Sequence, residues 1–220
     1  MIQLPFYIEK TMLKFSIITK NIFLEKAITE LIKEIASTKA INDFCFQYPH
    51  SNNELKNSDL IITEMEVGEC FLCQNMERNQ LERPIHIILA QKEITVNTYT
   101  LPLCIQGAIL LYKKSNIDTI SKVLSTNIDE LVTGKRSKIP KDKKRCLRCP
   151  HQRLSESQMK VINSVYIGLN NHQTAQMLGI SHKTVYSHKS RIMKKFKLET
   201  HQELIRLSSI IMEKMQCSFH

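Results

Sequence analysis

The 220-residue chain predicts two domains of different class, an α/β domain over residues 1–134 and an all-α domain over residues 153–220. In the first part, short apolar runs typical of strands alternate with amphipathic helical patterns, which favours a parallel sheet flanked by helices. In the last part, the apolar residues recur at helical spacing. Residues 135–152 lie between the two parts and are rich in cations, so they indicate a basic linker.

Charge is divided unevenly between these parts. Residues 135–220 contain 18 Lys and Arg against 5 Asp and Glu, a net charge of +13, whereas residues 1–134 contain 13 against 16, a net charge of −3. A mildly acidic half joined to a basic half is typical of a regulatory domain attached to a nucleic-acid-binding domain. An anionic membrane could also attract a basic surface, but no long amphipathic helix with aromatic anchors supports that interpretation.

Five strand-like runs and three helical patterns make up the predicted α/β domain. The run DLIIT at 59–63 is a strong strand candidate, and IHIILA at 85–90 follows directly after Pro84. Because strand and helix patterns alternate along the chain, the sheet is expected to be parallel. The strands are predicted at residues 14–19, 41–48, 59–63, 85–90 and 108–112, and the helices at residues 22–35, 71–81 and 116–131.

The all-α domain opens with a capped helix and a short second helix. Ser155 and Gln158 have the spacing of a capping box, which satisfies two amide donors at a helix start. Gly168 and the polar pair that follows Leu169 stop this helix, and Asn171 is the expected N-cap of a short helix over residues 172–178. On the first helix, an apolar stripe is predicted from Met159, Ile162, Val165, Tyr166 and Leu169, and on the second, the inward positions are Thr174, Ala175 and Leu178.

A glycine corner then leads into a basic third helix. Gly179 tolerates the left-handed conformation that such a tight corner needs, and Ser181 can cap the helix that follows. This order of helices is typical of a DNA-binding helix-turn-helix. The alternative is that the basic side of the third helix is only the solvated face of an ordinary helix. Val185, Ile192, Met193 and Phe196 are predicted to point inward, and the outward side shows Lys183, Thr184, Tyr186, Ser187, His188, Lys189, Ser190, Arg191 and Lys194.

The stretch resembles the LuxR-type helix-turn-helix of the NarL/FixJ family of bacterial transcription regulators. The family pattern reads L-[ST]-x-R-E, then G-x-S-N-K-E-I-A-x-x-L-x-I-S-x-x-T-V-x-x-H, then I-x-x-K-[LF]. The chain departs from it at Ser157 and Gln158, at Thr174 for Ile, and at Tyr186, where Lys is common. The segment K-T-V-Y-S-H-K further resembles the RcsA-type auxiliary regulators, which work with a second family member. Matches lie at Leu154, Ser155, Gly168, Asn171, Ala175, Leu178, Ile180, Ser181, Thr184, Val185, His188, Ile192, Lys195 and Phe196.

The helix-turn-helix implies contacts with double-stranded DNA along the third helix. This helix is expected to enter the major groove, where base edges and phosphates are read by different side chains. His188 is assigned either a phosphate contact or a structural role. Tyr186, Ser187 and Ser190 are expected nearest base edges, and Lys183, Thr184, Lys189 and Lys194 nearer phosphates.

A further amphipathic helix is predicted over residues 201–215, with Leu204, Leu207, Ile211 and Met215 on one stripe. In the family the fourth helix packs on the first and offers a dimerisation surface, so we expect a homodimer or a heterodimer with another LuxR-type regulator. The alternative is that the stripe belongs only to the core.

The layout of the N-terminal part resembles a response-regulator receiver domain, a flavodoxin-like fold. In that family an Asp at the end of the third strand accepts a phosphoryl group, and nearby carboxylates hold Mg²⁺. Here the corresponding position is Glu64, no acidic pair follows the first strand, and Ala90-Gln91 stands where a Ser or Thr is usual; only Lys113 or Lys114 keeps the family's lysine. We therefore expect a degenerate receiver that is not phosphorylated, in which Glu64 is either a mimic of a charged acceptor or a solvated side chain.

Seven cysteines include two pairs with C-x-x-C spacing, Cys70/Cys73 and Cys146/Cys149, with His151 near the second. That spacing lets two thiolates reach one zinc ion, so a metal or redox site is one interpretation. Cysteines that act as small buried hydrophobes are the alternative. The opening residues do not suit a secretory signal and no run of about eighteen apolar residues occurs, so a cytoplasmic protein with reduced thiols is expected.

Together these patterns predict a DNA-binding transcription regulator without enzymatic activity and without a cofactor. Two alternatives remain open. One is an auxiliary regulator that acts mainly through heterodimerisation with another family member, and the other is a cysteine-based metal or redox sensor.

Overall fold

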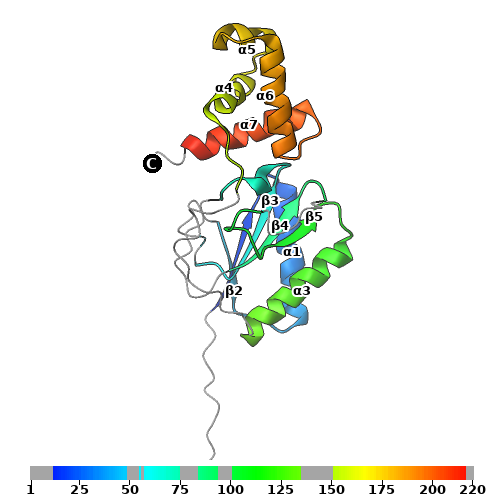
Figure 1. The fold of residues 1–220 in the computed structure, drawn as a ribbon. Helices are drawn as coiled ribbons and strands as arrows, with labels where there is room; N and C mark the ends of the chain where they lie inside the picture. Colours follow the sequence, from blue (N-terminus) through cyan, green and yellow to red (C-terminus); the bar gives the residue numbers. More distant parts are fainter. Residues whose placement is uncertain are drawn as a thin grey trace, which may run out of the picture. The chain divides into compact units, whose positions relative to one another are not determined.

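The computed structural model describes residues 12–48, 55, 57–74, 84–93, 101–134 and 151–216 (Figure 1). The chain forms two compact units. Of the described residues, the sheet unit holds 12–48, 55, 57–64, 84–89 and 107–134, and the helical unit holds 65–74, 90–93, 101–106 and 151–216. The units therefore interleave in the sequence. Within the described ranges, no helix combines the length and the apolar character needed to cross a membrane.

The described strands form one sheet in the order β2-β1-β3-β4-β5. β1 runs parallel to β2 and β3, with Phe15 opposite both Phe46 and Leu60. β4 begins and ends beside β3, because its first N–H reaches the Asp59 carbonyl at 2.8 Å and the Gln91 N–H reaches the Met65 carbonyl at 3.3 Å. This strand order is that of the flavodoxin-like fold, as predicted. The bounds are Leu13–Ile18 for β1, Phe44–Gln47 for β2, Leu60–Met65 for β3, Ile85–Ala90 for β4 and Ile109–Tyr112 for β5.

Helices α1 (Ile22–Thr38) and α3 (Ile117–Thr133) pack against each other and share one core with the sheet (Figure 1). Asn21 caps α1 by accepting the N–H groups of Phe23 and Leu24, and Asn116 caps α3. Every second strand residue points into this core, which is the period expected for one face of a sheet. The buried members include Leu13, Phe15, Ile32, Leu60, Ile62, Ile87, Leu89, Leu124 and Ile128.

The helix predicted over residues 71–81 is wrong in the part that the structure describes. A single turn of 3-10 helix (η1) covers Glu69–Phe71, and Leu72 is already extended. Cys70 and Phe71 are buried in the core of the helical unit, and the Gln74 side chain donates to the carbonyls of Glu69 and Leu72 at 3.1 Å each. These contacts replace the backbone bonds that a helix would supply. Residues 75–81 lie outside the described residues.

Four helices form the larger part of the helical unit: α4 (Glu156–Tyr166), α5 (Asn171–Leu178), α6 (His182–Lys195) and α7 (His201–Gln216). α4 packs on α6 and α7, and α5 packs on α6. The predicted stripe on α7 is buried at Leu204, Leu207 and Ile211, but Met215 is 39% exposed and does not belong to the core. The other fully enclosed side chains include Val161, Ile162, Val185, Ile192 and Phe196.

Two segments from earlier in the chain complete the helical unit. Gly68 has a positive φ of 86°, and a Cβ there would lie 2.9 Å from the Leu198 side chain, so this close approach requires glycine. Lys92 pairs with Glu199 at 2.6 Å and with Glu203 at 2.7 Å. Residues that follow β3 and β4 thus pack on the turn between α6 and α7.

A histidine in the sheet unit couples stability to pH. His86 lies on β4, where its Nε2 atom is 3.0 Å from Oγ1 of Thr63. Burial disfavours the charged imidazolium and lowers the pKa of His86 to about 4. The unfolded chain therefore takes up a proton at a higher pH than the folded chain does. The contribution of His86 to stability is complete above about pH 6.5 and is lost as the pH falls towards 4.

We expect the chain to lose about 1–2 kcal/mol more stability between pH 7 and pH 5 than a His86→Gln variant loses. Glutamine can keep a hydrogen bond to Thr63 but does not titrate. Urea unfolding followed by circular dichroism at both pH values measures this difference. Equal losses in the two proteins would show that His86 is not the titrating group.

Candidate nucleic-acid interface

Helix caps fix the directions of α4, α5 and α6. The predicted capping box of Ser155 and Gln158 is present at the start of α4. At α5 the prediction was wrong by one residue, because Asn170 rather than Asn171 is the N-cap, and Asn170 forms a second capping box with Gln173. Ser181 caps α6 as predicted, through a bond from the Thr184 N–H.

A rigid corner joins α5 to α6. Gly179 closes α5 with a φ of 64°, the left-handed conformation predicted for it. Thr174 is fully buried, and its hydroxyl donates to the Asn170 carbonyl at 2.8 Å, so a polar side chain is satisfied where the family pattern has Ile. Ala175 is also buried. The corner therefore holds α6 at a fixed angle to α5.

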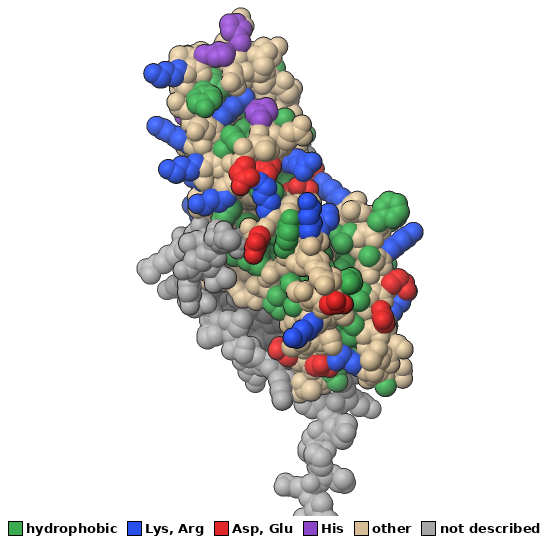
Figure 2. Space-filling model, turned by 90° about the vertical axis from the view of Figure 1, so that its right-hand side faces the viewer, with side chains coloured by type: hydrophobic (Ala, Val, Ile, Leu, Met, Phe, Trp, Pro, Cys, Tyr) green, Lys and Arg blue, Asp and Glu red, His purple; other side chains and the backbone are tan. Residues whose placement is uncertain are grey.

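One side of α6 is buried and the opposite side is open to solvent. Val185, Ile192 and Phe196 are 0% exposed, as their spacing predicts, whereas Met193 is only half-buried. On the open side, Tyr186 is 67% exposed. Figure 2 shows Lys and Arg side chains standing out along one edge of this unit, in the upper part of the view. The exposed members of the predicted site are Lys183, Tyr186, Ser190 and Lys194, joined by Arg191, which the predicted DNA contacts do not include.

Lys189 does not lie on the open side, so its predicted outward position is wrong. Its side chain is only 7% exposed, and Nζ donates to Oδ1 of Asn171 at 2.6 Å. Burial lowers the pKa of this lysine. Lys189 thus links α6 to the first turn of α5, and Asn171, predicted as a cap, is its acceptor.

Three further members of the predicted site are half-buried. The Thr184 hydroxyl lies 2.8 Å from the Ser181 hydroxyl, within the cap of α6. Ser187 and His188 occupy the margin between the buried and open sides. Nδ1 of His188 is buried and, within the described part of the chain, has no hydrogen-bond partner. This position fits either of the two roles assigned to His188.

The segment around α6 carries no negative side chain. Residues 157–198 contain seven Lys or Arg and no Asp or Glu. The cations are Lys160, Lys183, Lys189, Arg191, Lys194, Lys195 and Lys197. A continuous run of this length without a carboxylate gives the open face a positive potential that attracts phosphate groups.

A second group of interacting polar side chains lies in the sheet unit, at the carboxyl ends of the strands. Continuing the register of β1 with β3 places Thr19 opposite Glu64. The Thr19 hydroxyl donates to Glu64, and Lys113 after β5 forms an ion pair with it. Burial raises the pKa of Glu64, but the bonds from Lys113 and Thr19 outweigh that effect and hold it below its ordinary value. Glu64 is therefore an ionised side chain fixed by two partners, not a solvated one.

The two thiols of the first C-x-x-C pair, Cys70 and Cys73, differ in burial. Cys70 is buried, and burial raises the pKa of its thiol to about 12, which makes it a poor nucleophile and a poor metal ligand. Cys73 is half-buried and follows the η1 turn.

Within the part of the chain that the structure describes, no three His, Cys, Asp or Glu gather as they would around a metal ion. The described residues around Cys70 and Cys73 therefore do not complete a tetrahedral site, which needs more ligands than this pair can supply. Cys146 and Cys149 lie outside the described residues.

The C-terminal part of the chain is similar to known proteins. Residues 152–208 match the model described as bacterial regulatory proteins, luxR family. The response regulator protein TmoT of Ectopseudomonas mendocina is 34% identical over 70 residues, which are 32% of this chain and 32% of that protein. The match thus spans about a third of the length of this curated relative.

Solved structures of RcsB from Salmonella enterica serovar Typhimurium are also similar. RcsB bound to promoter rprA with the phosphomimetic BeF3− is 17% identical, with a TM-score of 0.47, over 90% of this chain and 99% of that chain. RcsB bound to promoter P1flhDC is 17% identical, with a TM-score of 0.49, over 90% and 98%.

A Lys189→Ala variant is expected to destabilise the helical unit by about 1–3 kcal/mol, because it opens a cavity and leaves Asn171 without its buried donor. Lys183→Ala, an exposed change on the same helix, should alter stability by less than about 0.5 kcal/mol. Urea unfolding of each full-length variant, followed by helical circular dichroism, measures both values. Equal stabilities of the two variants would contradict the structural role of Lys189.

Proposed function

We propose that the chain regulates transcription by binding specific sequences in double-stranded DNA, on the basis of the match between residues 152–208 and the luxR family of bacterial regulatory proteins. One observation carries the proposal. The open side of α6 presents Lys183, Tyr186, Ser190, Arg191 and Lys194 within a segment that has no acidic residue. In this proposal the chain has no catalytic activity of its own.

The mode of binding follows from the geometry of a helix-turn-helix. A recognition helix lies in the major groove with its N-terminal residues near base edges. The 14 residues of α6 span about 21 Å, which is long enough to cross the groove. Tyr186 and Ser190 are placed near base edges, and Lys183, Arg191 and Lys194 near phosphates. Lys189 acts through the position of α5 and α6 instead of touching DNA.

We further propose that phosphorylation does not control the protein. A phosphoryl acceptor must be a free carboxylate beside bound Mg²⁺. Glu64 is instead held by Lys113 and Thr19, and Thr19, Lys20 and Asn21 follow β1 without a carboxylate. The carboxylate at the position where the resemblance places the acceptor is therefore already paired with a cation inside the fold.

Dimerisation along α7 is also part of the proposal. DNA sites for helix-turn-helix proteins are commonly two-fold, which requires two copies of the binding domain. α7 keeps two large apolar side chains at its surface, Ile205 at 42% and Met215 at 39% exposed. Whether the second copy is the same chain or another LuxR-type regulator is decided by measuring the mass of the purified protein in solution by light scattering, alone and with DNA.

Fluorescence anisotropy with a pool of random-sequence genomic duplexes tests DNA binding. We expect affinity to fall steeply with salt, and a Lys183→Ala/Lys194→Ala variant to bind more weakly with a log–log salt slope reduced by about 2. The matched control is Lys26→Ala/Lys122→Ala, which removes two exposed lysines from the sheet unit. Equal losses in the two variants, or binding without salt dependence, would count against α6 as the binding helix.

Phosphorylation is tested with acetyl phosphate and Mg²⁺, followed by intact-mass measurement and by the same DNA titration. We expect no added phosphoryl group and an unchanged DNA affinity, because the acceptor position is already ion-paired. A phosphoryl group that maps to the sheet unit and shifts DNA affinity would show that phosphorylation does control the protein.

A further inference from the structure

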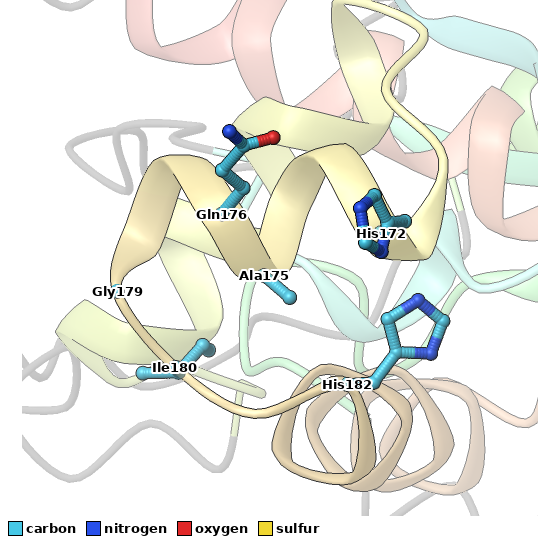
Figure 3. Close-up of a pocket in the computed structure, with 6 residues that line it drawn as sticks. All are labelled: His172, Ala175, Gln176, Gly179, Ile180 and His182. Atoms are coloured by element: carbon cyan, nitrogen blue, oxygen red, sulfur yellow. The ribbon is translucent and has the colours of Figure 1, made fainter.

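Two histidines from different helices meet at the corner between α5 and α6. His172 lies in the first turn of α5, and His182 is the first residue of α6. Their ring centroids are 5.8 Å apart, with the ring planes inclined at 52°. Both side chains are exposed and line one pocket of about 520 Å³. Figure 3 shows the two rings together at one end of that pocket, with Gln176 pointing away from them.

We propose that His172 and His182 form a two-histidine binding site for a transition-metal ion such as Zn²⁺, which bridges the two helices of the helix-turn-helix. The site is distinct from the predicted DNA contacts and from the cysteine pairs, and it does not depend on the proposed function.

The separation of the rings fits one shared metal ion. A zinc ion lies about 2.0–2.1 Å from an imidazole nitrogen, and therefore roughly 3.2 Å from the ring centroid. Two such rings are then about 5.2 Å apart at a tetrahedral angle and about 6.4 Å apart when they lie on opposite sides of the metal. The observed 5.8 Å falls between these limits.

The backbone around the two histidines is already fixed. Asn170 and Ser181 cap the two helix starts that carry the rings. The left-handed Gly179 and the buried side chains of Ala175 and Val185 hold the corner between them. A site assembled on rigid elements loses little conformational entropy when the ion binds, so two protein ligands can give measurable affinity.

The ligand atoms near the two histidines favour one class of metal ion. Mg²⁺ and Ca²⁺ require oxygen ligands, usually carboxylates, and the chain has none between Glu156 and Glu199. The positive ends of two helices also disfavour a cation that binds only by charge. Imidazole suits Zn²⁺, Cu²⁺ and Ni²⁺, whose bonds to nitrogen are strong enough to overcome that field. Water completes the coordination shell in the free protein, and the pocket has room for it.

The test is a ZnCl2 titration of the full-length, reduced protein without DNA, followed by NMR of the histidine ring signals. We expect the signals of His172 and His182 to shift together, with one binding constant. His172→Ala and His182→Ala should each weaken this binding step at least about tenfold, since the ion loses one of its two chelating ligands.

His201→Ala is the matched control, because His201 is exposed and is the first residue of α7, as His182 is of α6. It should leave the binding constant unchanged. Zinc binding that stays the same in both His172→Ala and His182→Ala would overturn the proposal, and so would ring signals that do not respond to zinc. A failure of DNA binding would not affect this result, since no DNA is present.

Discussion

The fixed corner between α5 and α6 is the constraint on which the candidate interface depends. Gly179 turns the chain in a left-handed conformation, while Asn170 and Ser181 close the helix starts on each side. Because α6 is then pinned by the fully buried Val185 and Ile192, its opposite side can only face solvent. Every side chain proposed to read DNA takes its direction from this arrangement, and so do the two histidines proposed to bind a metal ion.

The charged side chain at the strand ends of the sheet unit is paired, whereas most cations around α6 are not paired with a carboxylate from the same segment. In the sheet unit, the carboxylate of Glu64 is engaged by Lys113 and Thr19, so its charge is compensated inside the fold. Around α6 the cations have no acidic neighbour in the sequence from residue 157 to residue 198. Two of these cations are exceptions: Lys160 pairs with Glu156 at 2.8 Å, and Lys189 is buried against an amide oxygen instead of being offered to a ligand. Uncompensated charge is therefore concentrated on the side of α6 that a phosphate backbone could approach.

The sequence predicted what depends on local spacing and missed what depends on tertiary contacts. Strand alternation and the cap at Ser155 are local signals, and both are confirmed. The Asn170-x-x-Gln173 box has the same signal, and applying that rule there would have placed the cap correctly. In contrast, Lys189 lies four residues after Val185 and three before Ile192, so helical spacing places it on the buried side. The outward prediction followed from its charge, and no sequence rule shows that the charge is satisfied by Asn171. The DNA contacts themselves stay predictions.

We infer that the open side of α6 is the surface that contacts DNA. The most direct measurement is a map of backbone NMR signals of the full-length protein during addition of a DNA duplex. The account predicts that shifts concentrate at Lys183, Tyr186, Ser190, Arg191 and Lys194, with little change along the solvent side of α1. Shifts confined to the sheet unit, or none at saturating duplex, would contradict it.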